Sequence, residues 1–433
     1  MPSDVLPPPV PDHATTKLAH RSLWLLIAIN LFCYLDRYIL AAIIPELKAE
    51  FLADHPYPNT QAGYWTSAFL FSYMLTAPIF GYLADRHSRW MIIGISVAVW
   101  SVACGASGLA VGFVSLLITR VFLGIGEAGY GPAAPTLISD LYPVERRGRS
   151  LAWFYMAIPV GSALGFAFGG AMLLTSLGWR WAFFLVVIPG LLLSLFSFMM
   201  KEPPRTEASR KKPAKLADYK RLLKIPSLIT NILAQTALTF AIGGLSVWAP
   251  TYIHEARGQP LAQTNMIFGG ILVVGGLLAT LAGGLLGDRL RSRFPGSYFL
   301  VSGTGMLLGF PATVAMLYTP FPYAWGYIFL AIFFLFLNVG PSNTAIANVT
   351  PPAIRASAFA LNILVIHALG DAISPPLIGW VRDISNWNTA FLMVSTVMLV
   401  AGVIWLFSMK SLVRDTEIVT QLEADEALRN RHA

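Results

Sequence analysis

Long apolar segments alternate with short polar stretches from one end of the chain to the other. A helix needs about 20 mostly apolar residues to cross the hydrocarbon core of a bilayer, and each segment has about that length. The pattern therefore predicts an all-α integral membrane protein with twelve transmembrane helices. The segments lie at roughly 22–45, 62–84, 91–111, 113–138, 150–176, 180–200, 227–253, 264–287, 297–318, 323–348, 356–381 and 387–409.

Composition supports lipid as the surrounding solvent. Of 433 residues, 56% are hydrophobic and only 12% are charged, whereas soluble proteins carry about 25% charged residues. The net charge of +8 is compatible with nucleic-acid binding, but the basic residues cluster between apolar segments, which indicates membrane orientation instead. The two cysteines, Cys33 and Cys104, both lie in apolar segments and exclude a multi-cysteine metal site. We expect membrane lipids as partners, and no nucleic acid, metal or cofactor.

The positions of lysine and arginine predict the orientation. If the N-terminus is cytoplasmic, most of the 30 basic residues fall on cytoplasmic segments. The exceptions are four residues on the opposite side and two within the membrane: Lys48, Arg180, Arg257, Arg382, Arg37 and Arg120. Because cytoplasmic loops carry an excess of lysine and arginine, we expect both termini in the cytoplasm.

The polar stretches divide the chain into five parts. We expect a cytoplasmic N-terminal tail (1–21), a six-helix bundle (22–200), a cytoplasmic linker (201–226), a second six-helix bundle (227–410) and a cytoplasmic C-terminal tail (411–433). No apolar stretch of a cleavable signal peptide precedes Arg21, so the first apolar segment should be a retained helix. The basic linker is either a solvated tether or a surface that rests on anionic lipid headgroups.

Internal repetition relates the two bundles. The run Gly81–Arg86 recurs as Gly284–Arg289, about 200 residues later. Two further pairs of landmarks recur at nearly the same offset and in the same order, namely Gly131-Pro132 as Gly340-Pro341, and Trp179 with Phe183 as Trp387 with Phe391. A repeat at a fixed offset indicates two copies of one structural unit. Each half should therefore hold six helices in the same orientation.

The repeated loop carries the most specific resemblance. Gly81–Arg89 is similar to the Gly-x-Leu-Ala-Asp-Arg-x-x-Arg loop of the major facilitator superfamily, with Ser88 where that family usually has glycine. Arg120–Glu127 resembles its Arg-x-x-x-Gly-x-Gly motif. The resemblance implies two pseudo-symmetric six-helix bundles that rock between two states. We expect a cytoplasmic gate, or else simple charge anchoring at the membrane edge, formed by Gly81, Asp85, Arg86, Arg89, Asp288 and Arg289.

Four charged residues lie inside the first half of the membrane domain: Asp36, Arg37, Arg120 and Glu127. Charges within a bilayer are costly and by default mark a functional site. Adjacent helical residues point about 100° apart, so one of Asp36 and Arg37 can contact segment four while the other faces a central cavity. We expect proton coupling at Asp36 or Glu127, and contacts to a substrate anion from Arg37 and Arg120. The alternative is that the four charges only neutralise one another.

The second half has a different set of polar residues. Its segment ten has no acid opposite Glu127, but segment eleven carries His367 and Asp371 on one helix face. Histidine titrates near neutral pH, so this pair is a candidate for substrate binding, although a packing histidine explains it nearly as well. Weaker candidates, equally well explained as asparagines that bridge helices, are Asn338, Asn343 and Asn362.

A narrower resemblance concerns the run Asn30–Tyr38, together with Gly124–Ala128 and Pro132–Pro135. These residues resemble the Spinster family of lipid transporters. The resemblance implies a bacterial relative in the inner membrane, a monomer, and an amphipathic anionic substrate such as a lysophospholipid or a sphingolipid-like molecule.

The sequence thus predicts a proton-coupled secondary transporter of a lipid-like anion. One alternative is a proton-coupled transporter of a water-soluble organic anion, and a second is a non-transporting membrane sensor on the same fold. We do not expect an enzyme, because the sequence has no phosphate-binding Walker loop, nucleophile elbow or His-Glu-x-x-His motif.

Overall fold

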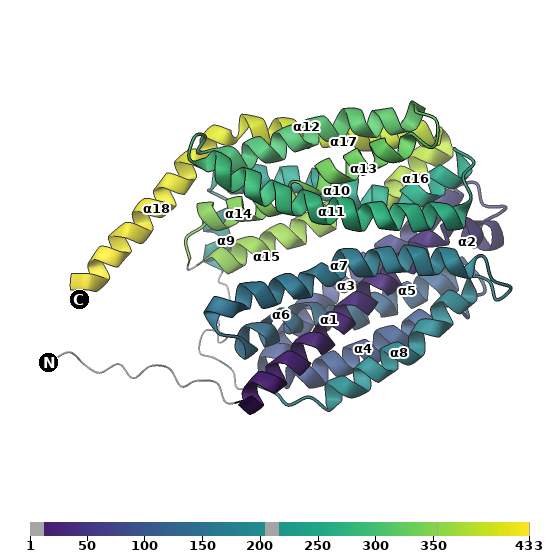
Figure 1. Ribbon diagram of the computed structural model, residues 1–433, viewed down its shortest axis with the longest axis horizontal. Coiled ribbons are helices and arrows are strands. Elements are labelled where there is room, and N and C mark those ends of the chain that lie inside the picture. Colours follow the sequence, from purple (N-terminus) through teal and green to yellow (C-terminus); the bar gives the residue numbers. More distant parts are fainter. Residues whose placement is uncertain (1–12, 204–215, 353, 433) are drawn as a thin grey trace.

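A computed structural model describes residues 13–203, 216–352 and 354–432 (Figure 1). Among the described residues, twelve spans, some of them interrupted helices, are long and apolar enough to cross a membrane, as the apolar segments predict. The helices of the first half are α1 (His13–Ala42), α2 (Ile44–Phe51), α3 (Pro58–Arg86), α4 (Arg89–Ser107), α5 (Phe113–Ala128), α6 (Tyr130–Leu141), α7 (Val144–Met172) and α8 (Arg180–Phe198).

The second half repeats this plan with one additional interruption. Its elements are α9 (Leu216–Leu222), α10 (Pro226–Glu255), α11 (Leu261–Arg291), α12 (Ser297–Tyr318), α13 (Ala324–Phe336), α14 (Val339–Val349), α15 (Arg355–Ile366), the π-helix η2 (His367–Asp371), α16 (Ser374–Ile384), α17 (Trp387–Phe407) and α18 (Met409–His432). Residues 1–12 of the expected N-terminal tail and 204–215 of the expected linker lie outside the described residues.

Two membrane spans are broken at corresponding places in the two halves. The span Phe113–Leu141 divides into α5 and α6, and the span Ala324–Val349 divides into α13 and α14. In each case a Gly-Pro pair of the internal repeat stands in the first turn of the second piece, with Pro132 in α6 and Pro341 in α14. Proline has no amide hydrogen and cannot complete the ladder to the residue four positions earlier, so the helix is interrupted there.

Small residues allow α1 and α7 to approach closely. Gly161, Gly165 and Gly169 lie one turn apart on α7 and face α1. A Cβ atom added at Gly165 would lie only 2.5 Å from the carbonyl oxygen of Leu35. Backbone contact of this kind is a common way for membrane helices to associate, and it sets the position of the charged part of α1.

The two halves meet mainly through α3 with α16 and α7 with α11. Figure 1 shows the halves as two stacked bundles that come together near α2 and α16, while the start of α1 and the end of α18 lie toward the opposite end. We call the end with α2 and α16 the closed end. There, a Cβ atom at Gly63 of α3 would lie 2.5 Å from the Cα atom of Pro376 in α16, so these two backbones touch.

Candidate functional site

Arg37 and Glu127 form a buried ion pair between α1 and α5. The Nη2 atom of Arg37 lies 2.5 Å from Oε2 of Glu127, and its Nε atom donates to the same oxygen at 2.7 Å. The thiol of Cys33 also donates to this oxygen, at 3.1 Å. The side chain of Glu127 is fully buried, whereas that of Arg37 is 23% exposed. Arg37 therefore contacts segment four and is also the more accessible member of the pair, so one residue combines the two roles that were expected to be divided between Asp36 and Arg37.

Asp36 and Arg120 form a deeper layer behind this pair. Asp36 is 2% exposed and Arg120 is 1% exposed. Arg120 donates to the hydroxyl of Ser107 and lies over the ring of Phe183, and the Asp36 carboxylate has Cys104 and Arg120 as its neighbours. Oδ1 of Asp36 and Nε of Arg120 have no hydrogen-bond partner among the described residues. This layer therefore has unused hydrogen-bonding capacity, which is costly in a buried site.

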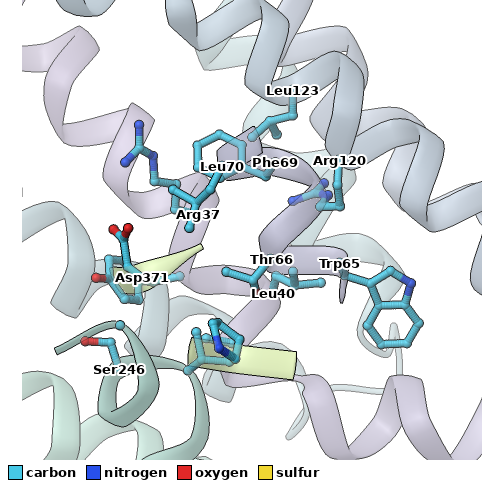
Figure 2. Close-up of a pocket in the computed structure, with 15 residues that line it drawn as sticks. Arg37, Leu40, Trp65, Thr66, Phe69, Leu70, Arg120, Leu123, Ser246 and Asp371 are labelled. Atoms are coloured by element: carbon cyan, nitrogen blue, oxygen red, sulfur yellow. The ribbon is translucent and has the colours of Figure 1, made fainter. Parts of the chain in front are cut away.

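A cavity of about 100 Å³ lies between the two halves beside these charges. The first half contributes mainly Arg37, Tyr38, Trp65, Phe69 and Arg120, and the second half contributes Gly243, Ser246, Val247, Asp371 and Pro375. Figure 2 shows Asp371 on the side of the cavity where Arg37 lies, with Arg120 across from them. The cavity thus presents cations from one half and a carboxylate from the other.

Aromatic rings surround the guanidinium of Arg37. Its Cζ atom lies 4.8 Å from the ring centroid of Tyr34, 4.6 Å from that of Phe69 and 5.6 Å from that of Tyr73. The faces of aromatic rings attract a cation. These rings hold the guanidinium at the cavity wall without neutralising its charge, which the Glu127 carboxylate balances.

His367 and Asp371 lie on the π-helix η2, which interrupts span eleven. Nδ1 of His367 lies 2.9 Å from Oδ2 of Asp371. Single-turn π-helices within α-helices are frequent at functional sites. The turn places Asp371 at the cavity, where a Cβ atom added at Gly243 of α10 would lie 2.6 Å from its Cβ atom. His367 does not itself line the cavity, but it contacts Asp371, which does.

The three candidate asparagines lie away from the cavity lining. Asn338 donates to the carbonyl oxygens of Phe334 and Leu335 on its own span, and Asn343 donates to Val339. Asn362 donates to the side chain of Gln235 at 3.1 Å and so links α15 to α10. Asn362 therefore bridges two helices, as the alternative interpretation has it, whereas Asn338 and Asn343 bond to the backbone of their own span.

The residues of the expected gate lie at the end opposite the closed end. Arg89 is buried and forms ion pairs with Asp140 at 2.5 Å and Glu202 at 2.8 Å. Asp288 accepts a hydrogen bond from Tyr298 at 2.8 Å. These contacts stay within one half. The other members are mostly surface residues. Arg86 lies over the ring of Tyr82, and among the described residues nothing lies within 4 Å of a Cβ position at Gly81.

Polar contacts between the halves gather at the closed end. Nζ of Lys48 lies 2.5 Å from Oε1 of Glu255 and donates to Asn59 at 2.6 Å. Oδ1 of Asp383 accepts from the backbone and side chain of Asn59, and Oδ2 accepts from those of Thr60. We name these residues, with Trp387, which donates to Glu255, the closed-end network. Burial lowers the pKa of Lys48, while the Glu255 carboxylate opposes that shift.

Comparisons with known proteins agree with this architecture. A family model described as Major Facilitator Superfamily matches residues 26–370. The chain is 36% identical over 404 residues to protein spinster homolog 1 of Xenopus tropicalis, covering 86% of this chain and 75% of that protein. The chain belongs to the Spinster family of the major facilitator superfamily. The relatives of this Spinster protein are transporters, in agreement with the expectation that it is not an enzyme.

Two further relatives extend the likeness of this Spinster protein. It is 28% identical over 463 residues to a probable sphingolipid transporter, spinster homolog 1, of Arabidopsis thaliana, covering 94% of this chain and 92% of that protein. Its fold is similar to that of a bacterial homolog to the human lysosomal transporter Spinster, crystallised in an inward-facing and unoccupied conformation. That similarity has a TM-score of 0.77 at 22% identity and covers 93% of this chain and 98% of the other.

Sequence reasoning about this Spinster protein missed the closed-end network. The sequence singled out Lys48 only as one of four basic residues on the side opposite the cytoplasm. Its partner Glu255 lies 207 residues away, and nothing in the local pattern relates the two. The one available signal was that a lysine outside the positive side of a membrane protein needs a specific reason to be there.

Proposed function

We propose that this Spinster protein is a proton-coupled secondary transporter that moves an amphipathic, lipid-like anion by alternating access. The observation that supports this most is the pair of Arg37 and Glu127. Its cation borders the cavity between the halves, while its carboxylate is fully buried. An anion bound in the cavity would contact this cation.

The coupling follows from competition for one cation. An anion that binds Arg37 takes over its hydrogen bonds and leaves Glu127 charged and unpaired in a buried position. An uncompensated buried charge costs several kcal/mol, and binding one proton removes that cost. Substrate and proton therefore favour each other's binding, and this relation is reciprocal. Asp36 is the alternative site for this proton, with Arg120 and Asp371 as further substrate contacts.

Alternating access is supported by the uneven contacts between the halves. The closed-end network joins them at one end, and the gate residues at the other end make their contacts within each half. The excess of basic residues at the gate end favours the cytoplasmic side. We propose an inward-facing conformation in an inner membrane, with both termini cytoplasmic. Asp85, Arg86, Arg89, Asp288 and Arg289 would then contact across the halves when the gate end closes.

Uptake by proteoliposomes under an imposed pH gradient tests the coupling. We expect Glu127→Gln to abolish proton-driven uptake of a lysophospholipid while exchange between internal and external substrate continues, because the amide mimics a protonated carboxyl group. Glu417→Gln, a change on the surface of α18, should behave as the wild type. Full proton-driven uptake by Glu127→Gln would remove this residue from the mechanism.

A competition arm tests the class of substrate. Lysophospholipid should compete with uptake, and a hydrophilic sugar acid should not. Competition by the sugar acid with no effect of the lysophospholipid would instead favour transport of a water-soluble organic anion.

A further inference from the structure

A groove distinct from the transport cavity lies between α9 and the C-terminal helix α18. It has a volume of about 440 Å³. We call it the linker–tail groove, and it is lined by Arg221, Lys224, Ile225, Pro226, Val349, Pro351, Ile354, Arg414, Asp415, Ile418, Val419 and Leu422. None of these residues lines the cavity beside Arg37, so the groove has to be explained separately.

The groove lies where several membrane spans end. One span begins at Pro226, another ends at Val349, and a third begins at Ser357. The last span ends at Phe407, directly before α18 begins at Met409. The lining residues therefore stand at the boundary between hydrocarbon and water, at the depth that lipid headgroups occupy.

The charge on the groove is positive. Arg221, Lys224 and Arg414 are exposed. The acidic lining residue, Asp415, is 6% exposed, and its Oδ2 atom accepts hydrogen bonds from the backbone and hydroxyl groups of Ser227 at 3.0 and 2.7 Å. Its other oxygen accepts from Arg414, so its charge is already compensated.

Two of the cations remain available. Arg221 and Lys224 form no ion pair with any residue that the structure describes. Beside the groove, Arg355 of α15 pairs with Glu423 of α18 at 3.1 Å, so the neighbouring acid of α18 is also engaged. An anion entering the groove would meet two free cations and no free carboxylate among its lining residues.

The remaining wall of the groove is apolar. Ile418 and Leu422 lie one turn apart on α18 and are 49% and 51% exposed. Val349, where one span ends, and Ile354, shortly before the next span begins, also line the groove. Exposed apolar side chains directly beside free cations match a ligand that carries both an anionic group and a hydrocarbon chain.

We propose that the linker–tail groove binds an anionic membrane phospholipid. Its phosphate lies between Arg221 and Lys224, and its acyl chain lies against Ile418 and Leu422. A free phosphate ion would use the cations but not the apolar wall, which is why a lipid fits better. The bound lipid joins the linker helix to the C-terminal helix on the surface of the second half, away from the path of the transported substrate.

Lipid titration of the purified full-length protein, followed by native mass spectrometry, tests this. We expect phosphatidylglycerol to bind more tightly than phosphatidylcholine, and high salt to reduce this preference. The double variant Arg221→Gln/Lys224→Gln should lose about tenfold or more in affinity for phosphatidylglycerol. The matched double variant Lys201→Gln/Arg293→Gln removes two exposed cations outside the groove and should bind as the wild type does.

A third variant and a soluble competitor separate lipid from phosphate. Leu422→Gln should weaken binding of phosphatidylglycerol and leave binding of glycerol phosphate unchanged, and millimolar inorganic phosphate should not displace the lipid. Equal binding of both lipids by the wild type, or equal loss in the two double variants, would overturn the proposal. So would displacement of the lipid by inorganic phosphate. The lipid preference of the wild type requires no substitution, so it tests the proposal even if a variant fails to fold.

Discussion

Arg37 is the residue on which the site depends most. It gives one hydrogen bond and one ion-pair contact to the same oxygen of Glu127, while the other oxygen, Oε1, has no partner among the described residues. Three aromatic rings surround its guanidinium. The side chain is therefore held in place by neighbours that do not all need its charge, which suits a residue that exchanges one anionic partner for another.

Removing either charge of this pair alone should destabilise the protein more than removing both. We expect Arg37→Gln to lower the free energy of unfolding by about 3–5 kcal/mol, because Glu127 is left buried and unpaired. Arg37→Gln/Glu127→Gln should recover most of that loss. Thermal unfolding in detergent at neutral pH compares Arg37→Gln and the double variant with the wild type. A double variant that unfolds at as low a temperature as Arg37→Gln would show that the pair is not what holds these helices.

Sequence alone located this site because a charge within an apolar segment is conspicuous. Asp36, Arg37, Arg120 and Glu127 stand out in that way, and the structure places them together as two buried layers. The pairing was not predictable, since the sequence left open whether Asp36 or Arg37 contacts segment four. Asn338 and Asn343 also stand out in an apolar segment, but the structure does not place them at the site. Polar side chains in membrane helices often bond to the backbone of their own span, as these two do.

At the scale of elements, the number and length of the spans were predictable because bilayer thickness sets them. The interruptions within spans four, ten and eleven were not, since hydrophobicity does not report a missing backbone hydrogen bond. The sequence nevertheless contained the cause of the interruptions in spans four and ten, namely Pro132 and Pro341. The π-helix η2 carries no such marker, and its placement of Asp371 at the cavity emerges only from the three-dimensional structure.

The contact of α1 with α7 provides a test at this scale. Gly165→Ala places a methyl group within 2.5 Å of the Leu35 carbonyl oxygen, so we expect a loss of about 1–3 kcal/mol in the free energy of unfolding. Gly270→Ala is the matched control, because no atom of the residues that the structure describes lies within 4 Å of that Cβ position. It should be neutral or stabilising by up to about 1 kcal/mol. Equal unfolding temperatures for the two variants would show that α7 can move away from α1 without a loss in the free energy of unfolding.

At the scale of the whole molecule, two similar bundles are joined unevenly. The internal repeat predicted the two halves, but no repeat could predict where they touch, since the contacts differ between conformations. Five helices contribute to the closed-end network: α2 and α3 from the first half, and α10, α16 and α17 from the second. Its position makes it the main polar obstacle to opening that end.

Weakening this network should shift the conformational equilibrium. Asp383→Ala removes the acceptor of four hydrogen bonds from Asn59 and Thr60. At about 1 kcal/mol each, this loss should increase the population with the closed end open at least tenfold. Spin labels on α2 and α16, measured by electron paramagnetic resonance, should report a longer distance. Glu46→Gln, an exposed change on α2, serves as the control, and an unchanged distance distribution in Asp383→Ala would argue against a gating role.

The balance of charge within the first half has an electrical consequence. Asp36, Arg37, Arg120 and Glu127 together carry no net charge, and under the proposed mechanism a monovalent anion enters with one proton. The loaded and the empty carrier then have the same charge. A membrane potential contributes about 2.3 kcal/mol per elementary charge moved across the membrane for each 100 mV. Because no net charge moves in this cycle, the potential should not affect it. Transport should be electroneutral, and a potassium diffusion potential imposed with valinomycin should leave the uptake rate unchanged.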